Sequence, residues 1–255
     1  MARYYFIFFL LFAFASQAQI NEQDTLSLAI QVQVGGSHQK GNVELSRVTG
    51  RVELLKQVGG QLVLKSQNSY LFQKIVGRKA DENIESRNFL YYNPQSRLYP
   101  YAIFFLSTNY RRDVDLRYFG GLGATYQLLR TPRHNLKLSG NGLYEKSFYT
   151  NDLYNKGEFD GNSMLEAFWY SAYLSGFHKV GKQGLRLVYE VYWQQSVSNA
   201  GQFRFHVATG LDINVMKGLG IQSRYNFSYE NVVALGNSTE DTLWTWGLIY
   251  QINKP

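Results

Sequence analysis

The sequence predicts an all-β protein, a closed antiparallel transmembrane β-barrel of about twelve strands preceded by a cleaved signal peptide. Three observations support this prediction. Apolar and polar residues alternate with a period of two along most of the chain. The 255 residues include 20 tyrosines and 17 phenylalanines but only 4 prolines, a composition typical of strands joined by short turns. The first residues form a targeting segment.

The chain begins with a predicted secretory signal peptide, residues 1–18. Arg3 forms a short basic region, and residues 4–15 form an uninterrupted apolar run. Small residues at the −3 and −1 positions place cleavage after Ala18. A transmembrane anchor is the disfavoured alternative, because this run is too short to span the ~30 Å of hydrocarbon in a bilayer. Residues 19–255 are then the barrel domain, and the absence of cysteine excludes disulfides and a lipid anchor on cysteine.

Segments of alternating residues follow one another through this domain. In one of the clearest, residues 203–215, aromatic and aliphatic residues alternate with arginine, histidine, aspartate and asparagine. A strand sorts such residues onto two faces, whereas a helix would scatter them around its circumference. Most segments run about 10–14 residues, which suits a tilted membrane crossing better than a soluble strand. The predicted strands are 24–36, 43–56, 61–73, 85–93, 98–110, 115–130, 136–149, 162–178, 185–197, 202–215, 220–232 and 241–252.

The predicted connections alternate in length. One set is short and rich in turn residues, whereas the other set includes two longer charged loops, residues 74–84 and 150–161, and a polar loop at 233–240. Short periplasmic turns opposite longer outer loops are typical of bacterial outer-membrane barrels, and an even strand number returns both termini to the periplasm. The short connections are 58–60, 93–97, 131–135, 180–184 and 216–219.

The environment decides which face of the sheet points outward. Lipid offers no hydrogen bonds, so a sheet survives in it only when it closes into a barrel. The apolar face must then meet lipid while the polar face lines the lumen; a soluble barrel would have the opposite arrangement. Aromatic residues near strand ends are expected outside, as interfacial girdles. They are Tyr99, Tyr101, Tyr144, Trp193, Trp244 and Trp246, with residues 225–229.

The C-terminal segment resembles the outer-membrane assembly signal read by the barrel-assembly machinery. Thr245, Gly247, Tyr250 and Ile252 match its polar, glycine and two hydrophobic positions, although residues 253–255 replace the terminal aromatic residue. The resemblance implies that the assembly machinery is a partner during biogenesis.

A Gly-Asn pair at 41–42, residues 115–126 and residues 241–250 together resemble the domain-of-unknown-function 481 family of salt-induced outer-membrane proteins. The resemblance implies an outer-membrane β-barrel and carries over no catalytic residue and no cofactor. Gly121 and Gly123 fall on one face of their strand. A bare backbone there permits sharp bending or the close approach of a side chain.

Ionisable residues on the predicted polar face form the candidate site. One hypothesis is a basic constriction that passes or binds anions, since rings of arginine or lysine favour anionic solutes. The favoured alternative is a network of ion pairs that fills the lumen, because buried charges normally pair. The residues are Arg117, Lys137, Glu145, Arg186, Glu190, Arg204, His206, Asp212, Arg224 and Glu230.

The predicted function is a structural or envelope-stress role in the bacterial outer membrane, with or without a narrow channel for small, anionic solutes. Alternatives are a soluble periplasmic or secreted barrel that binds an apolar ligand, and a lipid-modifying enzyme built on His206, Asp212 and a serine. We expect no enzymatic activity, cofactor or metal site, because the sequence contains no nucleotide-binding or metalloprotease motif.

Outer-membrane lipid and lipopolysaccharide are the expected partners, and nucleic acid is not, despite a formal net charge of +7. Arg78, Lys79, Arg111 and Arg112 lie in predicted outer loops, where anionic head groups are found. Further basic residues lie at the opposite turns, so the charge pattern does not favour one side.

Overall fold

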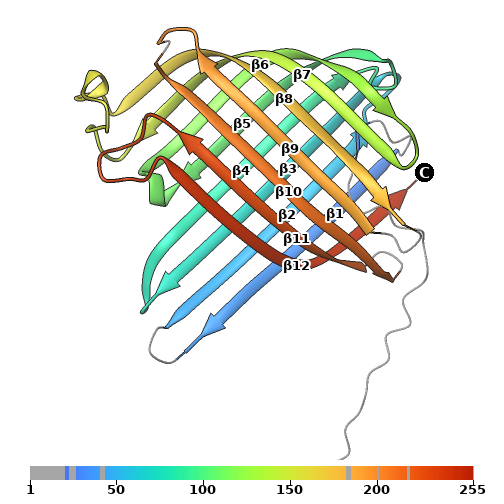
Figure 1. Ribbon diagram of the computed structural model, residues 1–255, viewed down its shortest axis with the longest axis horizontal. Helices are drawn as coiled ribbons and strands as arrows, with labels where there is room; N and C mark the ends of the chain where they lie inside the picture. The colour runs from blue at the N-terminus through green and yellow to red at the C-terminus, as the bar shows by residue number, and fades with distance from the viewer. Residues whose placement is uncertain are drawn as a thin grey trace, which may run out of the picture.

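The computed structural model describes residues 21–22, 27–40, 44–181, 185–199, 201–216 and 219–254. These residues form a closed antiparallel barrel in which the strands pair in chain order and β1 closes on β12 (Figure 1). The predicted signal peptide, residues 1–18, and the Gly-Asn pair at 41–42 lie outside the described residues. The strands are β1 Leu28–Gln39, β2 Leu45–Gln57, β3 Leu62–Ile75, β4 Arg78–Tyr92, β5 Leu98–Asn109, β6 Val114–Arg130, β7 His134–Tyr149, β8 Met164–Val180, β9 Leu185–Ser196, β10 Phe203–Met216, β11 Leu219–Glu230 and β12 Glu240–Lys254.

All twelve predicted strands are confirmed, but the predicted loop at 74–84 is wrong. Only Val76 and Gly77 connect β3 to β4, with φ angles of 49° and 73°. Positive φ at both central residues is the conformation of a type I′ turn, which matches the twist of a hairpin. Arg78 and Lys79 therefore belong to β4. The prediction failed because charged residues occur in loops and equally on strands that extend beyond the lipid.

The connections give the barrel two different ends. The loop end carries the longer connections, the tight turn at Val76 and Gly77, and two short 3-10 helices, Tyr110–Arg112 and Gly157–Phe159. The turn end carries the short turns, the start of β1 and the end of β12. At the loop end the connection between β7 and β8 packs against the one between β11 and β12, where the backbones of Tyr154 and Ala234 form a bridge (Figure 1).

Large apolar side chains cover the outside of the barrel. Leu122, Trp246 and Phe168 are 72%, 65% and 60% exposed, whereas Asp212 and Gln222 on the opposite face of the sheet are buried. The predicted girdle residues Trp193, Trp244 and Trp246 are all exposed on the outside. An apolar exterior around a polar interior is the arrangement of a transmembrane barrel and the reverse of a soluble one.

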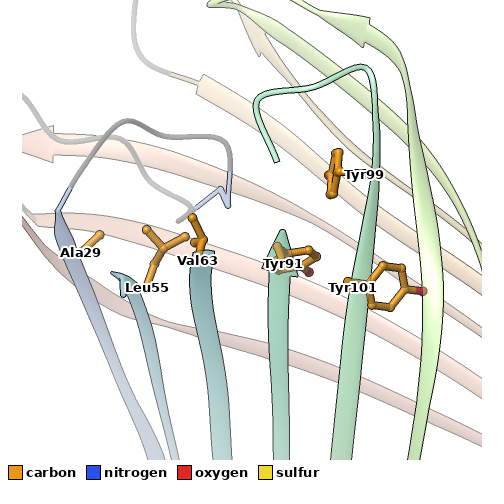
Figure 2. Close-up of a cluster of buried hydrophobic side chains, with 6 residues drawn as sticks. All are labelled: Ala29, Leu55, Val63, Tyr91, Tyr99 and Tyr101. Atoms are coloured by element: carbon orange, nitrogen blue, oxygen red, sulfur yellow. The ribbon is translucent and has the colours of Figure 1, made fainter. Parts of the chain in front are cut away.

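Tyr99 and Tyr101 correct the predicted outer girdle, because both point into the barrel. They belong to a buried cluster at the turn end, which consists of Ala29, Leu55, Val63, Tyr91, Tyr99 and Tyr101 (Figure 2). The prediction failed because β5 is apolar on both faces, with Leu98 and Phe104 exposed on the outer one. Alternation alone cannot then show which face is inside.

No helix in the described part of the chain is long and apolar enough to span a bilayer.

Candidate functional site

The ionisable residues predicted to face the lumen all lie on the inner face of the barrel. The structure joins four of them through ion pairs that cross from one wall to the other. Arg117 on β6 donates to Glu230 on β11 at 2.7 Å, and Arg204 on β10 donates to Glu145 on β7 at 2.6 Å. Arg117 also lies 3.6 Å from Glu145, so these four side chains form one continuous network.

Arg112 extends this network to the loop end. Its Nη1 lies 3.1 Å from Glu230 and its Nε donates to Asp241 at 2.7 Å. The side chain is almost fully buried, so Arg112 does not face lipid head groups as expected of an outer-loop arginine. Arg111 remains more than half exposed and lies 3.4 Å from Asp241.

Arg87 on β4 is a lumen residue that the alternation pattern did not reveal. Its guanidinium lies 3.5 Å from Glu190 on the opposite strand β9 and 3.7 Å from Glu85 on its own strand. Both separations exceed the length of an ordinary hydrogen bond, so Arg87 is held mainly by electrostatic attraction. The alternation of polar and apolar residues is weak in β4, because the strand ends on four consecutive apolar or aromatic residues, 89–92.

The remaining predicted residues lie outside this cross-lumen network. Asp212 accepts from Gln222 at 3.2 Å and pairs with Arg224 at 2.5 Å. The His206 ring stacks on Tyr192, with ring centroids 5.0 Å apart. Asp212 thus binds Arg224 and Gln222, and the structure does not bring it to His206 as a hydrolase triad would require. Arg186 lies over the ring of Phe177, 3.9 Å from its centroid.

Part of one lumen wall is apolar, a feature that the sequence pattern did not predict. Phe105 and Phe119 stack with centroids 4.5 Å apart and cluster with Leu143 and Trp169. The guanidinium of Arg204 lies 4.0 Å from the Trp169 ring centroid, where it meets the negative face of the ring. An aromatic and aliphatic cluster therefore occupies part of the wall formed by β5 to β8, and Arg204 from the opposite wall reaches it.

Glycines let side chains lie flat against the wall, as predicted for Gly121 and Gly123. A Cβ on Gly123 would come within 2.7 Å of the Tyr101 ring, and one on Gly121 would come within 2.7 Å of Leu143. At Gly210 the same space is filled by Arg224, whose Cδ would lie 2.5 Å from a Cβ.

Three adjoining cavities occupy the lumen. An outer vestibule of about 270 Å³ lies between β1–β4 and β9–β12 and is lined mainly by polar and charged residues. An amphiphilic cavity of about 180 Å³ lies against the apolar wall. Arg87, Glu85 and His206 line both spaces, which therefore adjoin. A turn-end cavity of about 50 Å³ lies beyond them, and Phe89 and Tyr101 line both it and the amphiphilic cavity.

Glu22, ahead of β1, is buried within the turn end of the lumen. Its carboxylate accepts from Tyr99 Oη at 2.8 Å, pairs with the ammonium of Lys137 and lies 3.8 Å from that of Lys65. Burial raises the pKa of the Glu22 carboxyl, but the two lysines outweigh this effect and bring the pKa down to about 2. The carboxylate therefore stays charged and links three strands at this end.

The residues that resemble the assembly signal lie on the seam where the barrel closes. In β12, Tyr250 pairs with Val32 and Ile252 pairs with Ile30 of β1. The side chains of Tyr250 and Ile252 are exposed on the outside, whereas Thr245 lines the outer vestibule. A Cβ at Gly247 would come within 3.2 Å of the Val34 carbonyl oxygen.

Comparison with solved structures finds other barrels. The NanC porin matches with a TM-score of 0.53 at 10% identity, covering 88% of this chain and 100% of that one, which shows a shared fold. The translocator domain of the autotransporter NalP from Neisseria meningitidis matches with a TM-score of 0.46 at 15% identity, covering 88% of this chain and 86% of that one. An outer-membrane channel from Pseudomonas putida F1 matches with a TM-score of 0.45 at 16% identity, covering 92% and 100%.

No curated protein matches the sequence. The family described as "protein of unknown function, DUF481" matches residues 32–252. Since this match extends over nearly the whole barrel, the chain belongs to the DUF481 family.

Proposed function

We propose that this protein is an integral outer-membrane barrel whose lumen is a narrow channel for small solutes, open toward the loop end and constricted at the turn end. The observation that carries the proposal is the set of adjoining cavities inside an apolar exterior: two of about 270 and 180 Å³ lie beside each other, and one of only about 50 Å³ lies at the turn end. A water-accessible interior within a lipid-facing wall is what a channel requires.

The proposed location rests on the outer face of the barrel. Its exposed tryptophans, leucines and phenylalanines need a hydrocarbon environment. Outer-membrane lipid and lipopolysaccharide would cover this face, and the barrel-assembly machinery would read the segment from Thr245 to Ile252. Fractionation tests the location: the protein should stay in washed outer membranes after carbonate extraction. Release by salt or carbonate would instead favour a soluble barrel.

Conductance in planar bilayers tests the channel. We expect small, infrequent openings from the wild-type protein, because Glu22, Lys65 and Lys137 occupy the narrow end of the lumen. The Glu22→Gln variant removes the charge that holds these groups together and should open more often. Glu82→Gln, which changes an exposed carboxylate on β4, is the matched control and should leave conductance unchanged.

A structural barrel without conduction is the second candidate function. It is favoured by the ion pairs that join opposite walls, Arg117 with Glu230 and Arg204 with Glu145. These pairs would brace the barrel in a stressed envelope without passing solutes. Complete silence of both the wild type and Glu22→Gln would favour this function over the channel.

Absence of enzymatic activity is part of the proposal. A lipid-acting enzyme would have to use His206, the histidine on the inner face of β10. Lipid turnover by the purified barrel that disappears in His206→Ala would contradict the proposal.

A further inference from the structure

We propose that the amphiphilic cavity binds a small organic anion with an apolar body, such as an aryl or short-chain carboxylate. This inference names a solute class for the proposed channel. It rests on that function only for the route of entry, since binding in the cavity does not require conduction.

The shape of the ligand follows from the two sides of the cavity. Phe105, Phe119 and Leu143 line one side, where the apolar part of a ligand would be removed from water. Arg87 and His206 line the side that adjoins the outer vestibule. A ligand entering from the vestibule would therefore leave its polar group near Arg87 and insert its apolar body toward the stacked phenylalanines.

The sign of the ligand's charge follows from the cavity lining. Four arginines and two glutamates line it, an excess of two positive charges. Carboxylates outside this lining pair with the same arginines and offset the excess: Glu145 pairs with Arg117 and Arg204, Asp241 with Arg112, and Glu190 with Arg87. The outer vestibule has the opposite balance, with four arginines against five carboxylates. Of the two linings, that of the amphiphilic cavity is the more cationic, which favours an anion there. Its charged residues are Glu85, Arg87, Arg112, Arg117, Arg204 and Glu230.

Two of these arginines retain capacity to bind an anion. The ion pairs of Arg87 are 3.5 Å and 3.7 Å long, so its donors can reorient toward a closer carboxylate. Arg112 is 6% exposed, and its Nη2 has no hydrogen-bond partner among the described residues. The Arg87 guanidinium also lies 6.0 Å from the Phe105 ring centroid. A carboxylate bound to Arg87 would thus place an attached ring beside Phe105.

Calorimetry on the full-length barrel in nanodiscs tests this inference, with empty nanodiscs as the blank. Phenylacetate carries both the charge and the ring, acetate carries only the charge, and benzyl alcohol carries only the ring. Benzylammonium reverses the charge. We expect phenylacetate to bind at least about tenfold more tightly than each of the other three. Equal binding of acetate, benzyl alcohol or benzylammonium, or no binding of phenylacetate, would overturn the proposal.

Paired variants locate the site. Arg87→Gln should weaken phenylacetate binding about tenfold, whereas Arg51→Gln, an arginine that lines only the outer vestibule, should leave it unchanged. Phe105→Ala should weaken binding about tenfold, and Phe104→Ala, on the lipid-facing side of the same strand, should not. Equal effects within either pair would overturn the assignment.

The ligand series on the unmodified protein tests the proposal even if a variant fails to fold, which heat-modifiable gel mobility would show. Binding without conductance would disprove the channel and keep the site. Conductance without binding would disprove the site and keep the channel.

Discussion

The two halves of the lumen wall differ in chemistry although they belong to one continuous sheet. On the inner face of β4 to β8, aromatic and aliphatic side chains such as Phe105, Phe119 and Trp169 form a cluster among polar residues. On β9 to β12 the inner face carries Arg204, Asp212 and other polar residues, which bond to partners on neighbouring or opposite strands.

The difference shows that a barrel of this size can have a lumen that is neither uniformly polar nor uniformly packed. Charges from one half are neutralised by, or stacked on, groups of the other half, as Arg204 is on Glu145 and Trp169. Desolvated charges need such partners, since an unpaired charge in a poorly hydrated space is costly. The apolar cluster therefore leaves room for a ligand while the ionic contacts across the lumen hold the two halves together.

The largest expected effect comes from breaking the cross-lumen network. In Glu230→Leu, the buried Arg112 and Arg117 lose their shared carboxylate. We expect the free energy of unfolding to fall by about 3–5 kcal/mol, measured by urea titration of the barrel in lipid vesicles. A loss below about 1 kcal/mol would mean that lumen water screens these charges, and the two halves would then be independent.

The second largest change in unfolding free energy is expected when the contact of Glu22 with Tyr99 and Lys137 is broken. Glu22→Gln should reduce the free energy of unfolding by about 1.5–3 kcal/mol at neutral pH. The pKa of Glu22 is lowered from 4.5 to about 2 in the folded protein. Its contribution is therefore complete above about pH 4.5 and fades as the pH falls toward 2. Unfolding titrations of wild type and variant from pH 6 to pH 2 should converge at the acid end. A constant difference would contradict this assignment.

A methyl group on the apolar half tests its packing. In Gly123→Ala the new Cβ would lie 2.6 Å from the Gly140 carbonyl oxygen and 2.7 Å from the Tyr101 ring. We expect a loss of about 1–3 kcal/mol in unfolding free energy. Gly142→Ala on the adjacent strand is the control, because its Cβ would meet nothing within 4 Å. Equal losses would show that the effect belongs to the sheet and not to Tyr101.

The smallest expected effect is at the boundary between the halves. Glu85 is nearly half exposed and lies 3.7 Å from Arg87, so Glu85→Gln should change the unfolding free energy by less than about 1 kcal/mol. The same variant should bind phenylacetate slightly more tightly, because a repelling carboxylate is removed. Weaker binding would indicate that Glu85 positions Arg87 instead.

Sequence alternation predicted the strands well wherever one face was polar. On β10 and β11, residues such as Arg204 and Arg224 alternate with apolar neighbours, so their inward orientation follows from the alternation alone. On β4, β5 and β8 both faces carry aromatic residues. Tyr99 and Tyr101 were therefore assigned to the wrong face, and Arg87 was missed.

The type I′ turn at Val76 and Gly77 escaped prediction for a different reason. Arg78 and Lys79 look like loop residues in sequence, and only strand pairing with β3 shows that they extend the hairpin. Short-range composition does not report how far a strand continues past the lipid.

The order of residues by itself determined the strand number, the closed antiparallel topology and the outward direction of the apolar face, because lipid admits only a sheet without free edges. Only the tertiary structure decided which charges meet across the lumen, that Glu22 enters the turn end, and that an apolar cluster lines the same cavity as Arg87 and Arg112. Those features depend on the curvature that brings β4 opposite β9 and β6 opposite β11. No local pattern in the chain encodes such distances.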